Sequence, residues 1–171
     1  MERSKILETL QEHGVEYKLV EHPPATTIEL ADEYIEGHEG VRTKSLFLTN
    51  RKKTRTYLLI TDEYKQIDLK GFAGEVGESR LSFGSGELLA ETLGLEPGVV
   101  SPLGMIDPGH RSVALYLDKA MMQEEIFTFH PGDNRATLFM GTQDFLRLYD
   151  ELGIAYPVSY THLTLPTTPY V

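Results

Sequence analysis

The sequence predicts a single domain of mixed α+β class. Patterns typical of strands outnumber patterns typical of helices, and short turns join many of the predicted strands. No repeat and no interdomain linker interrupts the chain, whose 171 residues suit one domain that buries about two-thirds of its unfolded surface. The hydrophobic fraction of 40% supports a packed core.

The N-terminal part is predicted to hold two helices and a short strand between them. Apolar residues at helical spacing predict a helix over residues 3–13, which Gly14 ends. Residues 15–20 follow as a short strand. Thr27 is a candidate N-cap for a second helix over residues 28–34.

The middle of the chain is predicted to be rich in strands. Residues 44–49 and 56–61 are two apolar runs joined by a basic turn, which predicts an antiparallel hairpin. A short strand over residues 66–69 and a helix over residues 70–76 are expected next.

The C-terminal half alternates between further helices and strands. Ser85 is expected to cap a helix that Gly94 ends, and Thr142 opens a last helix that Gly153 ends. Apolar runs predict core strands over residues 99–103, 113–117, 126–129 and 136–140.

The last fourteen residues differ in composition from the rest of the chain. Residues 158–171 contain no charged residue, and residues 158–167 are similar to the in-frame translation of a sequencing-library transposon adapter. We therefore interpret residues 158–171 as a non-native, disordered tail attached to the native residues 1–157. We expect that a few natural residues after Pro157 are missing. A natural tail rich in threonine and proline is the alternative. Tyr160 and His162 belong to this segment and are left out of the site.

Composition and charge exclude several classes of function. A net charge of −10 disfavours indiscriminate binding to nucleic acid, since affinity for phosphates comes from neutralising them. The absence of cysteine excludes disulfides and thiolate chemistry and suits a reducing cytoplasm. Neither a signal peptide nor an apolar run of roughly 18 residues is present, so we expect a cytoplasmic protein without a membrane span.

A concentrated basic cluster lies in the predicted hairpin turn. It consists of Arg51, Lys52, Lys53 and Arg55. Two interpretations stay open for it, a solvated hairpin tip or a contact with a nucleic-acid backbone.

Lys44 and His130 are the most informative polar residues. Lys44 stands at the start of an apolar strand, where a cation is poorly placed unless it faces a cleft or water. His130 ends a later apolar strand and precedes Pro131, so packed, solvated and functional roles are all open to it. No two histidines have the spacing of a metal pair, and no phosphate-binding loop is present. We therefore expect neither a metal nor a cofactor.

The small polar residues do not form a hydrolase signature. Residues 82–86 read Ser-Phe-Gly-Ser-Gly, which lacks the G-x-S-x-G order of a nucleophile elbow. Their position before a predicted helix suggests backbone N–H groups directed at an anion or a carbonyl, with a plain N-cap as the alternative. Residues 98–104 are either a turn and a strand, or a rigid loop that presents main-chain groups to a ligand.

Seven short motifs in a fixed order carry a family resemblance. They are His22-Pro23 and residues 43–48, 68–70, 80–83, 98–102, 117–118 and 129–131. Together they resemble the YbaK/ProX family of bacterial prolyl-tRNA editing domains, and within it the free-standing proteins that deacylate mischarged alanyl-tRNA(Pro). The resemblance extends from about residue 3 to Pro157.

This resemblance implies both a fold and a reaction. The implied fold is a single editing domain with a central, mostly antiparallel mixed sheet, partly barrel-like and flanked by helices. The implied reaction is attack of water on the ester that joins alanine to the 3′-terminal adenosine of tRNA(Pro), in trans and without a metal. A cavity that admits alanine and excludes proline would act as a second sieve. The implied partners are the tRNA 3′ acceptor end and prolyl-tRNA synthetase.

The resemblance also implies roles for individual residues. Lys44 matches the family's lysine and is the expected catalytic residue, because its ammonium can bind the terminal phosphate or ribose and stabilise developing negative charge. Gly104 is expected to provide a backbone contact near the ester. The expected substrate-binding side chains are those of Ser45, Ser82, Ser85 and His130. Related sequences commonly have asparagine where this chain has the shorter Ser45, so the amino acid removed stays open.

Two alternative functions remain beside the deacylase of Ala-tRNA(Pro). The same fold could edit Cys-, Ser- or Thr-charged tRNA, or it could serve as a non-catalytic module that binds tRNA or a synthetase. Lys44 favours an enzyme, whereas the acidic composition favours reliance on a partner for tRNA affinity.

Overall fold

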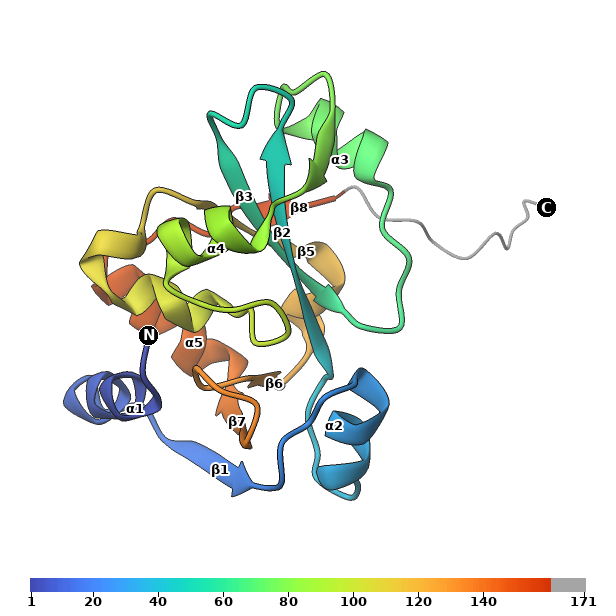
Figure 1. Ribbon diagram of the computed structural model, residues 1–171. Helices are drawn as coiled ribbons and strands as arrows, with labels where there is room; N and C mark the ends of the chain where they lie inside the picture. Colours follow the sequence, from blue (N-terminus) through green and yellow to red (C-terminus); the bar gives the residue numbers. More distant parts are fainter. Residues whose placement is uncertain (161–171) are drawn as a thin grey trace.

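The computed structural model describes residues 1–160 (Figure 1). Its α-helices are α1 (Arg3–Glu12), α2 (Ile28–Tyr34), α3 (Leu69–Glu75), α4 (Gly86–Leu93) and α5 (Thr142–Glu151). Its strands are β1 (Tyr17–Glu21), β2 (Thr43–Asn50), β3 (Thr56–Asp62), β4 (Leu81–Phe83), β5 (Ala114–Asp118), β6 (Ile126–Phe129), β7 (Ala136–Gly141) and β8 (Val158–Ser159). Short 3₁₀ helices cover Pro102–Ile106, Pro108–His110 and Lys119–Gln123. None of the helices in this part of the chain is long and apolar enough to cross a membrane.

The strands form two open sheets. The larger sheet has the order β4-β2-β3-β5-β8, and the smaller has the order β1-β7-β6. β2 pairs antiparallel with β3 and β4, whereas β5 runs parallel to β3 and β8. The smaller sheet is antiparallel throughout. The predicted α+β class and mostly antiparallel pairing are confirmed, but the strands divide between two open sheets instead of forming one central, partly barrel-like sheet.

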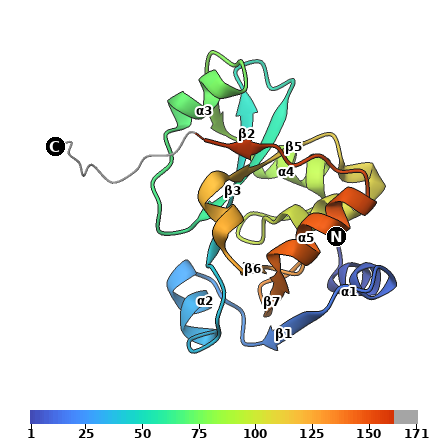
Figure 2. The ribbon, with the colours of Figure 1, turned by 180° about the vertical axis from the view of Figure 1, so that it is seen from behind.

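The two faces of the larger sheet contact different layers. Side chains alternate along a strand, so neighbouring residues of β2 and β3 point to opposite faces. One face packs on α3 through Leu48, Tyr57, Leu59, Phe72, Ala73 and Leu81. The other face packs on α4, α5 and the smaller sheet, with Phe47, Leu58 and Ile60 among its buried members. Figures 1 and 2 show α3 at one end of the molecule and the smaller sheet, with α1 and α2, at the other.

The predicted helix ends are confirmed by their capping contacts. The Thr27 hydroxyl accepts a hydrogen bond from the backbone N–H of Leu30 at 3.1 Å. The Ser85 hydroxyl accepts one from the N–H of Leu88 at 3.1 Å. Gly94 follows α4 with a φ of +64°, the left-handed conformation in which glycine avoids the clash of a Cβ.

Two predicted strands are wrong. Residues 66–68 form a loop that leads into α3, because the Asp68 carboxylate caps that helix by accepting from the N–H of Gly71. Residues 99–103 form a loop and the first turn of a 3₁₀ helix. Pro102 has no N–H for a strand ladder, and the hydroxyl of Ser101 caps the 3₁₀ turn instead.

The predicted start of the disordered tail is also corrected. Val158–Ser159 form β8, which runs parallel to β5, and Ser159 is buried. The backbone N–H of Tyr160 donates to the Glu75 carboxylate at 3.0 Å. The free edge of β5 offers N–H and C=O groups to any extended segment that follows residue 157, whatever its composition. Residues 161–171, which include His162, lie outside the described residues, and the non-native origin of the tail stays a prediction.

A buried tyrosine in α5 provides a test of the core. The Tyr149 side chain is fully buried, and its hydroxyl donates to the carbonyl of Pro102 at 2.6 Å. Tyr149→Phe leaves this buried carbonyl without its donor, so we expect the free energy of unfolding in urea to fall by about 1–3 kcal/mol. Tyr156→Phe is the matched control, since its hydroxyl donates to Asp150 in an exposed contact, and should change stability by less than about 0.5 kcal/mol. Equal losses in both variants would contradict this assignment.

Candidate functional site

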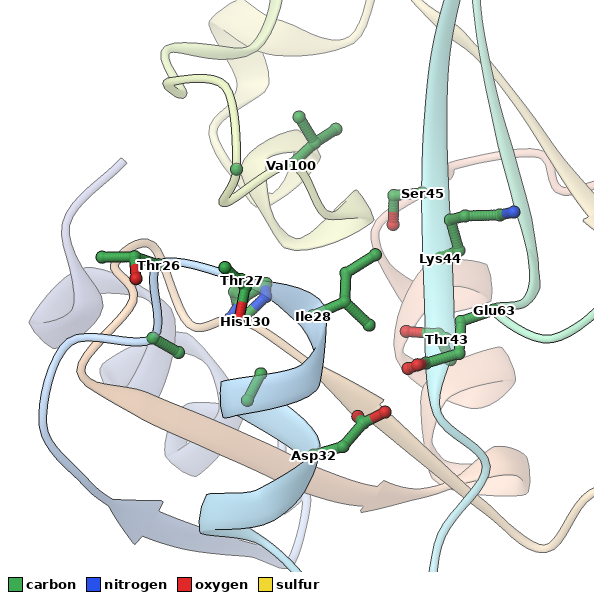
Figure 3. Close-up of a pocket in the computed structure, with 13 residues that line it drawn as sticks. Thr26, Thr27, Ile28, Asp32, Thr43, Lys44, Ser45, Glu63, Val100 and His130 are labelled. Atoms are coloured by element: carbon green, nitrogen blue, oxygen red, sulfur yellow. The ribbon is translucent and has the colours of Figure 1, made fainter.

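A cavity of about 380 Å³ lies between α2, the start of β2 and the loop before the first 3₁₀ helix (Figure 3). Residues 25–28 and two residues of α2 form one wall. The start of β2 and Glu63, which follows β3, form the opposite wall. Gly98, Val100 and His130 complete the lining. The cavity thus collects residues from five separate segments of the chain.

Three of the six predicted site residues line this cavity, namely Lys44, Ser45 and His130. They meet because β6 runs beside the start of β2. The N–H of Thr43 donates to the Thr128 hydroxyl at 3.4 Å, and the Thr43 hydroxyl donates to the Thr128 carbonyl. His130 follows β6 directly and is thereby brought to Ser45.

The other three predicted site residues do not line the cavity. Ser85 acts as the N-cap of α4, as the alternative interpretation proposed. Ser82 is exposed on β4 and pairs with the far end of β2. Gly104 is buried where a Cβ would lie 2.9 Å from a methyl group of Leu95 and 3.0 Å from the carbonyl of Leu93, so close packing explains this glycine.

Lys44 and Ser45 point to opposite sides of β2, as the strand alternation requires (Figure 3). Ser45 points toward the side of the cavity that holds His130. The Lys44 ammonium points away from it and lies 3.5 Å from the carbonyl oxygen of Lys65, at the limit of a hydrogen bond. The ammonium therefore stands at the rim, where an anionic group outside the cavity can reach it.

The backbone of Ser45 faces an interruption in the pairing of β2. The N–H of Asn50 donates to the carbonyl of Arg55, on the side of β3. Even-numbered residues of β2 therefore direct their backbone N–H and C=O groups to β3, and odd-numbered residues direct theirs to the opposite edge of the strand. On that other edge, Thr43 bonds to β6, and the carbonyl of Phe47 accepts from the N–H of Gly84 at 3.0 Å. Ser45 lies between these two contacts, beyond the reach of the three-residue β4. Its N–H is therefore placed to donate into the cavity.

Two carboxylic acids that the sequence analysis missed line the same cavity. Asp32 of α2 and Glu63 direct their carboxyl groups toward each other (Figure 3). The Tyr64 hydroxyl also donates to Asp32 at 2.9 Å. Burial, the hydrogen bond to Asp32 and its charge raise the pKa of Glu63 to about 8, against the opposing charge of Arg42. Glu63 therefore holds a proton at neutral pH.

Arg42 opposes the raised pKa of Glu63 by its charge but forms no ion pair with either carboxyl group. The Arg42 guanidinium instead donates to the carbonyls of Gly40, Ile35 and His38 at 2.8, 3.2 and 3.0 Å. Within residues 1–160, no ion pair involves Asp32 or Glu63. This end of the cavity is thus suited to a small cationic group of a ligand.

His130 contributes a neutral imidazole to the opposite end. Burial lowers the pKa of His130 most, and the charge of His22 lowers it further, while a hydrogen bond to the backbone of Ala136 opposes them. Its Nδ1 atom is buried and has no hydrogen-bond partner within the described residues. Because the ring lines the cavity, a neutral imidazole can contact a bound substrate there.

Residues 22–148 match the family described as the aminoacyl-tRNA editing domain. The chain belongs to this family. The prolyl-tRNA editing protein ProX of Acetoanaerobium sticklandii is 31% identical over 151 residues, which cover 88% of this chain and 92% of that protein. The prolyl-tRNA synthetase associated domain-containing protein 1 of Mus musculus is 31% identical over 150 residues, covering 84% and 87%. The resemblance to YbaK/ProX proteins is therefore confirmed.

The solved structures confirm the fold of this editing domain. A structure described as a candidate trans-editing enzyme for prolyl-tRNA synthetase superimposes with a TM-score of 0.71 and covers 95% of this chain and 97% of its own. The two sequences are 23% identical, so this likeness concerns the fold.

The basic cluster lies away from the cavity of the editing domain. Asn50 holds the hairpin tip, since its side-chain oxygen accepts from the N–H groups of Thr54 and Arg55. Asn50 is five residues beyond Ser45, or about 17 Å along the strand. Both interpretations of the cluster stay open. In the described part of the chain, no group of three or more His, Asp or Glu side chains is arranged to hold a metal ion.

The raised pKa of Glu63 predicts a dependence of stability on pH. The ordinary value is 4.5, so between about pH 4.5 and 8 the folded chain binds more protons at this group than the unfolded chain does. The contribution is fully present below this interval and is lost as the pH rises to about 8. As the pH is raised from about 6.5 to 8.5, we expect the urea concentration at the midpoint of unfolding to decrease in the wild type and to decrease less in Glu63→Gln.

Glu39→Gln is the control for this titration, because Glu39 is exposed and does not line the cavity. It should keep the wild-type dependence on pH. If Glu63→Gln also kept it, the raised pKa would be refuted.

Proposed function

We propose that this editing domain is a trans-acting deacylase that removes alanine from mischarged tRNA(Pro) in the cytoplasm. Membership of the aminoacyl-tRNA editing family and the similarity to ProX support the reaction class. The observation that carries the proposal is the small cavity that Ser45 and His130 line together with the carboxyl pair of Asp32 and Glu63. An aminoacyl ester has a carbonyl that suits the backbone N–H of Ser45 and an ammonium that suits the carboxyl pair.

The cavity suits a small amino acid. Its 380 Å³ lies near the lower limit of ordinary ligand pockets, and Ala25, Ile28, Ala31 and Val100 provide an apolar surface for a methyl side chain. Proline carries two further ring carbons, which these walls must exclude. Size exclusion of this kind is the sieve that an editing enzyme needs, since a synthetase cannot reject the smaller amino acid by binding alone.

Ser45 would polarise the ester carbonyl. Its backbone N–H meets the interruption in strand pairing and can donate to the oxyanion that forms when water attacks the carbonyl carbon. The bond from that carbon to the ribose oxygen then breaks, the ribose oxygen takes up a proton, and free alanine and tRNA are released. A protein nucleophile is unnecessary, because the aminoacyl ester is already activated and positioning supplies much of the rate.

Lys44 would bind the substrate from outside the cavity. Its ammonium stands at the rim on the other side of β2 from Ser45, where it can contact the phosphate of the terminal nucleotide. Such a contact would fix the 3′ end of the tRNA and thereby the ester. His130, whose ring lines the cavity, would contact the bound substrate.

Asp32 and Glu63 would bind the α-ammonium of the alanyl group. The pair offers one carboxylate and a protonated neighbour within the cavity, and neither forms an ion pair with a cation in residues 1–160. A charge-assisted hydrogen bond to the ammonium orients the ester, so that its carbonyl points toward Ser45.

Two observations favour other functions in the same fold. The short side chain of Ser45 leaves room for Cys-, Ser- or Thr-charged tRNA. The similarity to proteins named for association with prolyl-tRNA synthetase favours a module that binds the synthetase or the tRNA.

A deacylation panel separates these functions. We expect the wild type to release alanine from Ala-tRNA(Pro) and to spare Pro-tRNA(Pro), with slower release of cysteine and serine. Lys44→Ala should lower kcat/KM for Ala-tRNA(Pro) by about 100-fold, because it removes a cationic contact with the substrate. Lys5→Ala, an exposed lysine on α1, is the control. Equal rates for Lys44→Ala and the wild type would refute the role of Lys44, and a wild type without any turnover would favour the binding module.

The role of the carboxyl pair is tested by replacing the α-ammonium of the substrate with a hydroxyl group, as in lactyl-tRNA(Pro). With each rate divided by the spontaneous rate of the same ester, the wild type should prefer the alanyl over the lactyl ester. In Asp32→Asn this preference should fall by about 10- to 100-fold, the value of a charge-assisted hydrogen bond. Glu33→Gln, on the exposed side of α2, should retain it. An unchanged preference in Asp32→Asn would place the ammonium elsewhere.

A further inference from the structure

His22 is part of a motif that the proposed chemistry leaves without a role. It follows β1 and does not line the cavity. Pro23 restricts its backbone to an extended conformation. Both ring nitrogens are nevertheless bonded, Nδ1 to the carbonyl of Pro23 at 2.8 Å and Nε2 to the hydroxyl of Thr137 at 3.0 Å. Because a carbonyl can only accept, Nδ1 carries a proton and the ring is held in one orientation.

The ring of His22 contacts Tyr34, the last residue of α2. It stacks on Tyr34, with ring centroids 5.1 Å apart and an angle of 18° between the planes. Thr137 belongs to β7 and is buried, so the stack connects α2 to the smaller sheet. The same β7 pairs with β6, the strand that leads to His130. Through the stack, α2 is therefore in contact with the sheet whose strand β6 positions His130.

α2 depends on contacts of this kind because it buries little of its own surface. None of its seven residues is fully buried, and Ile28 is 55% exposed. At its N-terminal side, the N–H of Ala25 donates to the carbonyl of Asn134 at 2.9 Å. In the middle, Tyr64 donates to Asp32. Hydrophobic burial within the helix alone would position it weakly. The stack on His22 therefore acts with the buried Ile35, which follows α2 and whose carbonyl accepts from Arg42, to hold its C-terminal end.

We propose that His22 is a positioning residue that sets the width of the substrate cavity, by holding Tyr34 and with it α2 against the smaller sheet. The inference rests on the proposed function, since the width matters through the exclusion of proline. α2 and the residues before it form one wall of the cavity, whereas Ser45 and Glu63 belong to the other. An outward shift of α2 by about 1 Å changes that width by a substantial part of the difference between alanine and proline.

This role differs from ordinary structural support in what it controls. A residue that only stabilises the fold lowers the amount of active enzyme and leaves selectivity unchanged. A residue that positions the wall changes which amino acid enters. The ratio of kcat/KM for Ala-tRNA(Pro) to that for Pro-tRNA(Pro) therefore distinguishes the two roles, since the concentration of folded enzyme cancels in it.

The experiment compares His22→Ala and Tyr34→Ala with Tyr34→Phe, which keeps the stack. We expect the first two to lower the Ala-to-Pro ratio by about 10-fold or more, with a larger change in KM than in kcat for the alanyl ester. Tyr34→Phe should keep the wild-type ratio, because the Tyr34 hydroxyl is not needed for stacking. Thermal unfolding shows which variants are folded. A wild-type ratio in folded His22→Ala and Tyr34→Ala would overturn the inference and leave the proposed function intact.

A second measurement tests the position of α2 without any substrate. The N–H of Ala31 donates to the carbonyl of Thr27 at 3.1 Å, so its hydrogen exchange reports the opening of α2. We expect this exchange to be faster in His22→Ala and Tyr34→Ala and unchanged in Tyr34→Phe, with amides of α1 unaffected in all three. Unchanged exchange at Ala31 would overturn the inference even if the wild type failed to deacylate any tRNA.

Discussion

The antiparallel pairing of β2 with β3 determines where every group of the proposed site lies. Its register places Thr43 opposite Asp62, so Glu63 arrives beside the start of β2. It directs the backbone of Lys44 to β3 and leaves that of Ser45 free on the other edge. A slip of one residue would exchange the two faces, turning Lys44 into the cavity and Ser45 out of it. The buried cluster around Leu48, Tyr57 and Leu59 prevents such a slip.

The same strand has two other neighbours on its outer edge, and the space between them makes the site. β6 contacts Val41, two residues before β2, and Thr43 at its start, whereas β4 and Gly84 pair with β2 from Phe47 onward. A continuous third strand would use the N–H of Ser45 in a ladder and close the cavity. The short β4 and the turn of the chain at Pro131 thus leave one backbone donor for chemistry.

The two walls of the cavity, α2 and the start of β2, differ in charge and in burial. α2 brings Asp32 to the cavity but little apolar surface to the core, so its place depends on polar and stacking contacts. The larger sheet carries Ser45 and Lys44. With a net charge of −10, the proposed binding of tRNA would depend on local cations such as Lys44, and a partner that raises the local concentration of tRNA would assist it.

Features with a local or a motif-level cause can be predicted from the sequence alone. Thr27 and Ser85 were predicted as caps because a hydroxyl before a helix has a near partner, and the seven ordered motifs were enough to predict the family. The strand over residues 99–103 was wrong because an apolar run does not reveal whether it packs as strand or 3₁₀ helix. Which polar residues meet depends on the tertiary fold. Asp32 and Glu63 lie in acidic stretches that look solvated, and no local signal records that helix docking and strand register bring them to one cavity.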